Sequence, residues 1–186
     1  MLGLVESGRL DALVRRYKQI YAVYLTMSDH PERSFGHRPF HRGPRYILEN
    51  GAVKYAGMFT HTLDSLFAHS QIYAQLKPAY YQRFASERAF DIHAAVVIKS
   101  MHELAARYHA HALTVIYPDF TRIEPILRAN GVRTLSLTDA MPDYISASEK
   151  YAIKYDGHPN ALANARIAEA LLEYILQHPH ATRERQ

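Results

Sequence analysis

Residues 112–137 read ALTVIYPDFTRIEPILRANGVRTLSL, and this stretch decides the fold class. Ala112–Tyr117 and Val132–Leu137 are short apolar runs rich in β-branched residues, which is the composition of buried strands. Between them, Thr121–Ala129 predicts a short helix that ends at Asn130-Gly131, a pair that tolerates the left-handed conformation. Strands and helices in this rhythm predict a parallel sheet with helices on both faces.

The same alternation extends to both sides of this stretch. Upstream, Ile20–Met27 is a β-branched and aromatic run that predicts another buried strand. Ala89–His109 has the spacing of a long helix with one buried face, and Ala161–Leu176 is a strongly patterned helix. We therefore expect a single three-layer α/β/α domain over residues 1–177, followed by a polar tail over 178–186.

The remaining segments predict smaller elements. They are an amphipathic helix over Asp11–Lys18, a small hairpin that pairs Tyr46–Leu48 with Ala52–Lys54, a helix over Phe59–Leu76 that Pro78 terminates, and a surface connection at Tyr80–Arg83. Residues 34–55 otherwise form a long loop that contains several glycines and prolines.

Composition excludes several classes of function. The chain has 186 residues, 48% of them hydrophobic and 22% charged, which are ordinary values for a globular domain. It contains no cysteine, so disulfides, thiol chemistry and cysteine-ligated zinc are excluded. The net charge of +4 is concentrated locally in Arg33–Arg45, which is a weaker footprint than nucleic-acid binding requires. We expect no nucleic-acid partner.

The sequence predicts no membrane span and no export signal within the chain. No apolar run reaches the length of about 18 residues that a spanning helix needs, and the amino-terminal residues lack the basic-then-apolar order of a signal peptide. The compartment remains open on these observations.

The motif Asp156-Gly157-His158-Pro159-Asn160 opens the last predicted helix and has two interpretations. In the first, Asp156 accepts the Nδ1 proton of His158 and leaves Nε2 available as a general base. In the second, Asp156-Gly157 is ordinary turn chemistry and Asn160 is a helix N-cap. The five residues alone favour the turn and cap over catalysis.

Polar residues follow the first predicted strand. Ser28, Asp29, His30 and Arg33 come directly after Ile20–Met27. Ligands of open α/β sheets bind at the carboxyl edge of the strands, so these side chains are candidate site residues.

The order of elements and the motif around His158 resemble the SGNH/GDSL hydrolase superfamily. The most specific part is Tyr155–Glu169 (YDGHPNALANARIAE), supported by Tyr117-Pro118, by Asn130-Gly131-Val132 and by Leu137–Ala140. The resemblance implies a flavodoxin-like α/β/α fold without cofactor or metal. It also implies a serine esterase or O-acyl (acetyl) transferase that acts on small-molecule or saccharide esters.

Roles are carried over only where residues match. His158 is similar to the general base of the family, and Asp156 to its acidic partner, although one residue separates them here where many members have two. The family places an Asn in the oxyanion hole after an early strand. Here the corresponding positions hold Asp29 and His30, and His30 paired with Arg33 is a substitute donor by analogy.

The nucleophile block of the family is absent. Members begin with a strand that ends in Gly-Asp-Ser, and this chain resembles their carboxyl-terminal two thirds. We therefore expect a missing first strand, an exposed sheet edge that invites pairing with another chain, and little activity of the chain alone. Ser28 is a weak substitute, because Pro31 and a long loop follow it instead of the sharp strand-to-helix turn that exposes an activated hydroxyl.

Two alternatives belong to other classes of function. The chain could be a non-catalytic binding module in which Arg33–Arg45 and the sheet edge hold a polysaccharide or another anionic ligand. A weaker alternative is a metal-dependent hydrolase that uses His30, Asp156 and His158. The spacing of His37 and His41 also resembles a zinc site, but Pro39 disfavours the helix that such a site needs.

Overall fold

A computed structural model of the protein describes residues 2–17, 19–34, 43–59, 70–155 and 157–178. Its helices and strands, in chain order, are α1 (Leu2–Glu6), α2 (Asp11–Val14), β1 (Tyr21–Thr26), α3 (His30–Ser34), β2 (Pro44–Glu49), β3 (Ala52–Met58), α5 (Gln71–Tyr80), α6 (Ser86–Tyr108), β4 (His111–Ile116), α7 (Glu124–Ala129), β5 (Thr134–Ser136) and α8 (Ala161–Gln177). A π-helical segment, Tyr81–Ala85, joins α5 to α6, and a 3-10 helix, Pro118–Ile123, precedes α7.

Three parallel strands form the central sheet in the order β1-β4-β5. Tyr21 lies opposite His111 at one end of the β1 and β4 pair, and Thr26 lies opposite Ile116 at the other. Only three residues of β5 pair with β4. The prediction of a parallel sheet in an α/β fold is confirmed.

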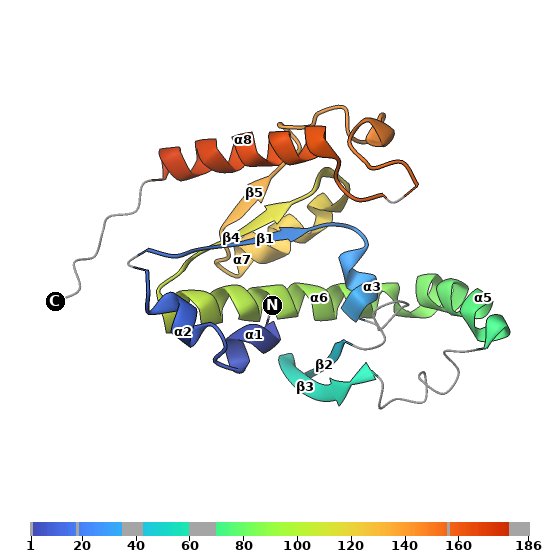
Figure 1. The fold of residues 1–186 in the computed structure, drawn as a ribbon. Helices are drawn as coiled ribbons and strands as arrows, with labels where there is room; N and C mark the ends of the chain where they lie inside the picture. Colours follow the sequence, from blue (N-terminus) through green and yellow to red (C-terminus); the bar gives the residue numbers. More distant parts are fainter. Residues whose placement is uncertain (1, 18, 35–42, 60–69, 156, 179–186) are drawn as a thin grey trace.

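Helices cover both faces of this sheet (Figure 1). The long helix α6 runs below the strands with α1 and α7, and α8 runs above them. Neighbouring residues of β4 point to opposite faces. Ile116 therefore packs in the core between the sheet and α6, and Val115 packs in the core between the sheet and α8. Both side chains are fully buried, which fixes the register of the central strand.

The predicted hairpin is confirmed and forms a separate two-stranded sheet. β2 and β3 pair antiparallel, with Glu49 opposite Ala52. The two linking residues, Asn50 and Gly51, have φ angles of 52° and 77°, the left-handed conformation that such a tight turn requires.

The predicted surface connection at Tyr80–Arg83 is wrong, because the chain stays helical from Gln71 to Tyr108. Pro78 does not end the helix, since α5 continues to Tyr80. The physical reason is a stripe of buried side chains at intervals of four residues, formed by Tyr81, Ala85 and Ala89, which rewards continued helix.

Two further expectations need correction. The amino-terminal region forms two short helices instead of one over Asp11–Lys18, and Gly8, with a φ of +69°, turns the chain between them. The strand β1 is only partly buried on the face toward α8, because Leu25 packs in the core there while Tyr21 and Val23 are 39% and 42% exposed.

Some predictions concern residues outside the described part of the chain. They are most of the helix over Phe59–Leu76, the basic residues between positions 35 and 42, and Asp156. Within the described residues, no helix has the length and apolar character that crossing a membrane demands.

Candidate functional site

The carboxyl end of β1 carries the polar residues that the sequence singles out. β1 ends at Thr26, and after a turn the short helix α3 begins at His30 (Figure 1). Ser28 and Asp29 lie in that turn, and Arg33 lies one turn of helix after Asp29. The four candidates therefore gather at one edge of the sheet.

A buried group of four side chains, here called the histidine cluster, lies beneath this turn. It consists of Tyr24, Thr26, His30 and His93. The hydroxyl of Tyr24 lies 3.2 Å from Nδ1 of His30, and the hydroxyl of Thr26 lies 2.9 Å from Nε2 of His93. The two imidazole rings meet edge to face, with centroids 5.9 Å apart. The cluster links β1 to the middle of α6.

Burial controls the protonation of the cluster. It is the main reason why the pKa of His93 falls from 6.5 to about 3, with the charges of His30 and Arg33 adding to the effect. Burial and the Arg33 guanidinium also lower the pKa of His30, against the opposing carboxylates of Asp29 and Asp119. Desolvation raises the pKa of Tyr24 to about 12. The cluster is therefore uncharged at neutral pH.

Asp29 connects the cluster to solvent. Its Oδ2 accepts a hydrogen bond of 2.9 Å from Nη2 of Arg33, and its Oδ1 lies 3.8 Å from Nε2 of His30. The structure thus brings together three of the predicted residues. His30, with 11% of its side chain exposed, is the member of the neutral cluster that lies beside this charged, exposed ion pair.

Ser28 points to a carboxylate and not to an imidazole. Its hydroxyl donates a hydrogen bond of 2.6 Å to Oδ2 of Asp119, just beyond β4. The bond ties together the carboxyl ends of neighbouring strands. It does not resemble the Ser–His contact of an activated serine, so the geometry gives no support to Ser28 as a nucleophile.

A row of three tyrosines, Tyr117, Tyr144 and Tyr151, attaches the region before α8 to the same edge. Tyr117 directly follows β4, and its ring meets that of Tyr144 edge to face at 5.0 Å. Tyr144 in turn lies 5.9 Å from Tyr151. The carbonyl of Tyr151 accepts a hydrogen bond of 2.9 Å from the backbone N–H of Asn160, so the start of α8 is fixed to the carboxyl end of β4.

His158 lies in the turn that leads into α8. Asn160 is the predicted N-cap: its Oδ1 accepts a hydrogen bond from the backbone N–H of Ala163. The carbonyl of His158 accepts a hydrogen bond of 2.7 Å from Ile153, and its side chain is exposed. The cap interpretation of the motif is confirmed for Asn160. Asp156, the predicted partner of His158, lies outside the described residues.

Tyr155, the residue directly before the Asp156-Gly157 pair, has an unusual backbone conformation. Its φ of +67° is left-handed, which is costly for an aromatic residue, and its side chain is 96% exposed. Strained residues of this kind concentrate at functional sites. The strain therefore marks the turn beside His158.

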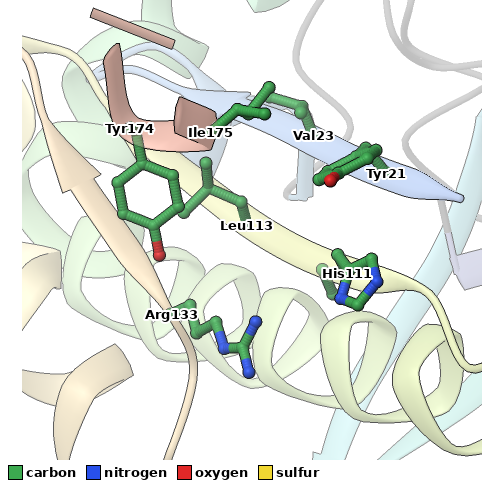
Figure 2. Close-up of a pocket in the computed structure, with 8 residues that line it drawn as sticks. Tyr21, Val23, His111, Leu113, Arg133, Tyr174 and Ile175 are labelled. Carbon is green, nitrogen blue, oxygen red and sulfur yellow. The ribbon is translucent and has the colours of Figure 1, made fainter. Parts of the chain in front are cut away.

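A shallow groove lies at the opposite end of the sheet (Figure 2). Tyr21 and His111, the first residues of β1 and β4, line it with Tyr174 and Ile175 from the last turns of α8. Its walls are mainly apolar, apart from His111 and Arg133. The carboxyl edge, where ionisable groups converge, is the better candidate for chemistry.

No family model, no curated protein and no solved structure matches this chain. Assignment of a function must therefore rest on the geometry of the edge itself. Among the described residues, no group of three or more His, Cys, Asp or Glu side chains is arranged to hold a metal ion.

The sequence interpretation missed His93, the more deeply buried of the two histidines in the cluster. It lies on the buried stripe of α6 between Ala89 and Val97, where every neighbour at helical spacing is apolar. A histidine on such a stripe needs a polar partner, and that requirement is the signal that could have found it. Its partner Thr26 gave no signal, because threonine is also an ordinary strand residue.

Proposed function

We propose that this chain provides the general base and the substrate-binding edge of an SGNH-like ester hydrolase or O-acyl transferase. The observation that carries the proposal is the attachment of the His158 turn to the carboxyl end of a parallel sheet. The row Tyr117, Tyr144 and Tyr151 holds the start of α8 there, beside the strand ends that carry Ser28 and His30.

In this proposal His158 accepts the proton of a hydroxyl group as its oxygen attacks the carbonyl carbon of an ester. The same imidazole then returns the proton to the departing alkoxide, so the cycle balances without a cofactor. The exposed position of His158 supports this role, because a buried imidazole such as His93 stays neutral and out of reach of substrate. Asp156 is proposed as the carboxylate that orients it.

His30 and Arg33 are proposed to bind the carbonyl oxygen as negative charge develops on it. His30 is held by the Tyr24 hydroxyl on Nδ1, while Arg33 is held by Asp29. Fixed donors of this kind stabilise an oxyanion more than mobile ones, because they need no reorganisation during the reaction.

The exposed ring of Tyr155 supports a saccharide substrate, because the C–H face of a sugar ring can stack on an aromatic ring. Its left-handed backbone keeps an aromatic surface in solvent next to His158, at a cost of roughly 1 kcal/mol. A backbone strain of this size is typically retained where the side chain contributes to function.

The source of the attacking hydroxyl separates the proposal from its alternative. The Ser28 hydroxyl is hydrogen-bonded to Asp119, so the proposal takes the attacking hydroxyl from outside the described residues. The alternative is a non-catalytic module that binds a polysaccharide or anionic ligand at the same edge. Both alternatives use His30 and Arg33. They differ in whether His158 affects turnover.

Hydrolysis of p-nitrophenyl acetate and of an acetylated oligosaccharide tests the proposal, with His158→Ala beside His178→Ala. His178 is an exposed histidine at the opposite end of α8, so it is a matched control. The proposal predicts that whatever rate the parent chain shows, however low, falls by about 10²-fold to 10⁴-fold in His158→Ala only. Saccharide binding by both variants, without turnover by the parent chain, would establish the binding module instead.

A further inference from the structure

The outer edge of β1 has peptide groups, at Val23 and Leu25, without partners among the described residues. The carbonyls of Ile20 and Thr26 point toward β4, where they accept hydrogen bonds from the backbone N–H groups of His111 and Tyr117. Peptide groups of a strand alternate in direction, so those of Val23 and Leu25 point away from β4. In the described part of the chain no strand lies beyond this edge, since the sheet order is β1-β4-β5.

The same residues present an apolar surface beside that edge. Side chains of a strand alternate between faces, so Tyr21, Val23 and Leu25 lie together on the face covered by α8. Figure 2 shows Tyr21 and Val23 to the right of Leu113, with Tyr174 from the end of α8 to its left. Val23 is 42% exposed, although Leu25 on the same face packs in the core that includes residues of α8.

The edge carries none of the features that prevent association. The sequence of β1, YAVYLT, has no charged residue and no proline, and its register with β4 is unbroken from Tyr21 to Thr26. Natural proteins protect exposed edges with lysines, prolines or bulges. An unprotected apolar edge is a template for another strand.

Charged residues before and after β1 favour a second copy of this chain, in the opposite direction, as the partner strand. Arg15 and Arg16 precede the strand, and they form no ion pair with the residues that the structure describes. Asp29, Glu32 and Arg33 follow it, and Asp29 forms an ion pair with Arg33 of its own chain. A second β1 in the opposite direction would place Arg15 and Arg16 of each copy beside this end of the other, where two carboxylates accompany one arginine.

We propose that two copies of this chain pair antiparallel through β1, about a two-fold axis at Val23. This register places Val23 opposite Val23 of the partner subunit and Tyr21 opposite Leu25 of the partner subunit. It pairs the outward peptide groups, joins the apolar faces, and produces one continuous sheet with three strands from each copy. The inference does not depend on the proposed function.

Single-cysteine variants test the register, since the natural chain contains no cysteine. In a hydrogen-bonded antiparallel pair the Cα atoms lie about 5.5 Å apart, within the range that a disulfide spans. Val23→Cys should therefore give a covalent dimer under mild oxidation. Tyr21→Cys is the matched control on the same strand and face. Its two copies would lie about 14 Å apart, too far for a disulfide.

Sedimentation equilibrium tests the association itself. The unmodified chain and Ile72→Lys, which alters a 70% exposed side chain on α5, should reach the mass of two chains as concentration rises. Val23→Lys should stay at the mass of one chain with an unchanged circular dichroism spectrum. The proposal is overturned by a monomeric parent chain at ~100 μM, by larger open assemblies, or by crosslinking of Tyr21→Cys in place of Val23→Cys.

Discussion

The hydroxyl of Ser28 donates a hydrogen bond of 2.6 Å to the carboxylate of Asp119, and this contact joins the carboxyl ends of β1 and β4. Both residues lie at the candidate site, yet their hydrogen bond serves to hold two strand ends together and does not activate the hydroxyl. A carboxylate is a poor base for a serine hydroxyl, since its pKa lies far below that of the alcohol. The contact therefore assigns Ser28 a positioning role at this edge.

A double-mutant cycle on Ser28→Ala and Asp119→Ala should show a coupling energy of about 0.5–1 kcal/mol in urea unfolding. The value is small because both groups are exposed and solvent competes for the bond. Arg166→Ala with Glu169→Ala, an exposed ion pair within α8 at 3.0 Å, provides a comparison of similar exposure. Additive effects of Ser28→Ala and Asp119→Ala would show that the bond is not formed in solution.

Thr26→Val should destabilise the protein by about 1–3 kcal/mol, because it leaves Nε2 of the buried His93 without its partner. Thr114→Val is the matched control. Thr114 is an equally buried threonine on β4, but its hydroxyl has no hydrogen-bond partner among the described residues, so its replacement should be neutral or stabilising. Equal losses in the free energy of unfolding for both variants would contradict this account of the cluster.

His93 should make the protein sensitive to acid. Its pKa in the folded state is lowered from 6.5 to about 3, so between these values the unfolded chain binds more protons than the folded chain. Stability is therefore complete above pH 6.5 and falls with decreasing pH toward 3, by at most about 1.4 kcal/mol per unit. His93→Gln should flatten this slope, as measured by urea unfolding from pH 7 to 4.5.

His102→Gln serves as the control for that experiment, since His102 is an exposed histidine on the same helix. It should leave the buried cluster intact, and with it the part of the slope that His93 contributes. An NMR titration that shows His93 gaining a proton near pH 6.5 in the folded protein would contradict the assignment of its pKa.

Asn160→Ala should cost about 1–2 kcal/mol, because Asn160 caps α8 and also donates hydrogen bonds to the carbonyls of Lys150 and Ala152. Asn164→Ala, in the next turn, removes a single exposed contact of 3.3 Å to Pro159 and should cost less than 0.5 kcal/mol. Thermal unfolding of the two variants compares them. A larger loss for Asn164→Ala would show that the cap does not hold the His158 turn.

Sequence periodicity predicted most of the fold correctly. The strands β1, β4 and β5, the long helix α6 and the final helix α8 all followed from apolar spacing, because each buries a continuous face. The missed helical connection between α5 and α6 has the opposite cause. Pro78 is a strong local signal for ending a helix, and tertiary burial of Tyr81 and Ala85 overrode it.

The candidate site was predictable only in part. Asp29, His30 and Arg33 are adjacent in sequence, so a single strand end delivers them together. His93 reaches them from a distant helix, and only the packing of α6 under β1 reveals that contact. Catalysis by His158 is carried by the resemblance and remains the proposal that needs a direct test.

Intact-mass spectrometry after treatment with a fluorophosphonate probe tests that proposal most directly. The parent chain, His158→Ala and the control His178→Ala are compared under conditions where all three are folded. If His158 activates a serine of this chain, the parent and His178→Ala gain one adduct and His158→Ala gains none. An adduct on His158→Ala as abundant as on the parent would contradict the role of His158 as the general base.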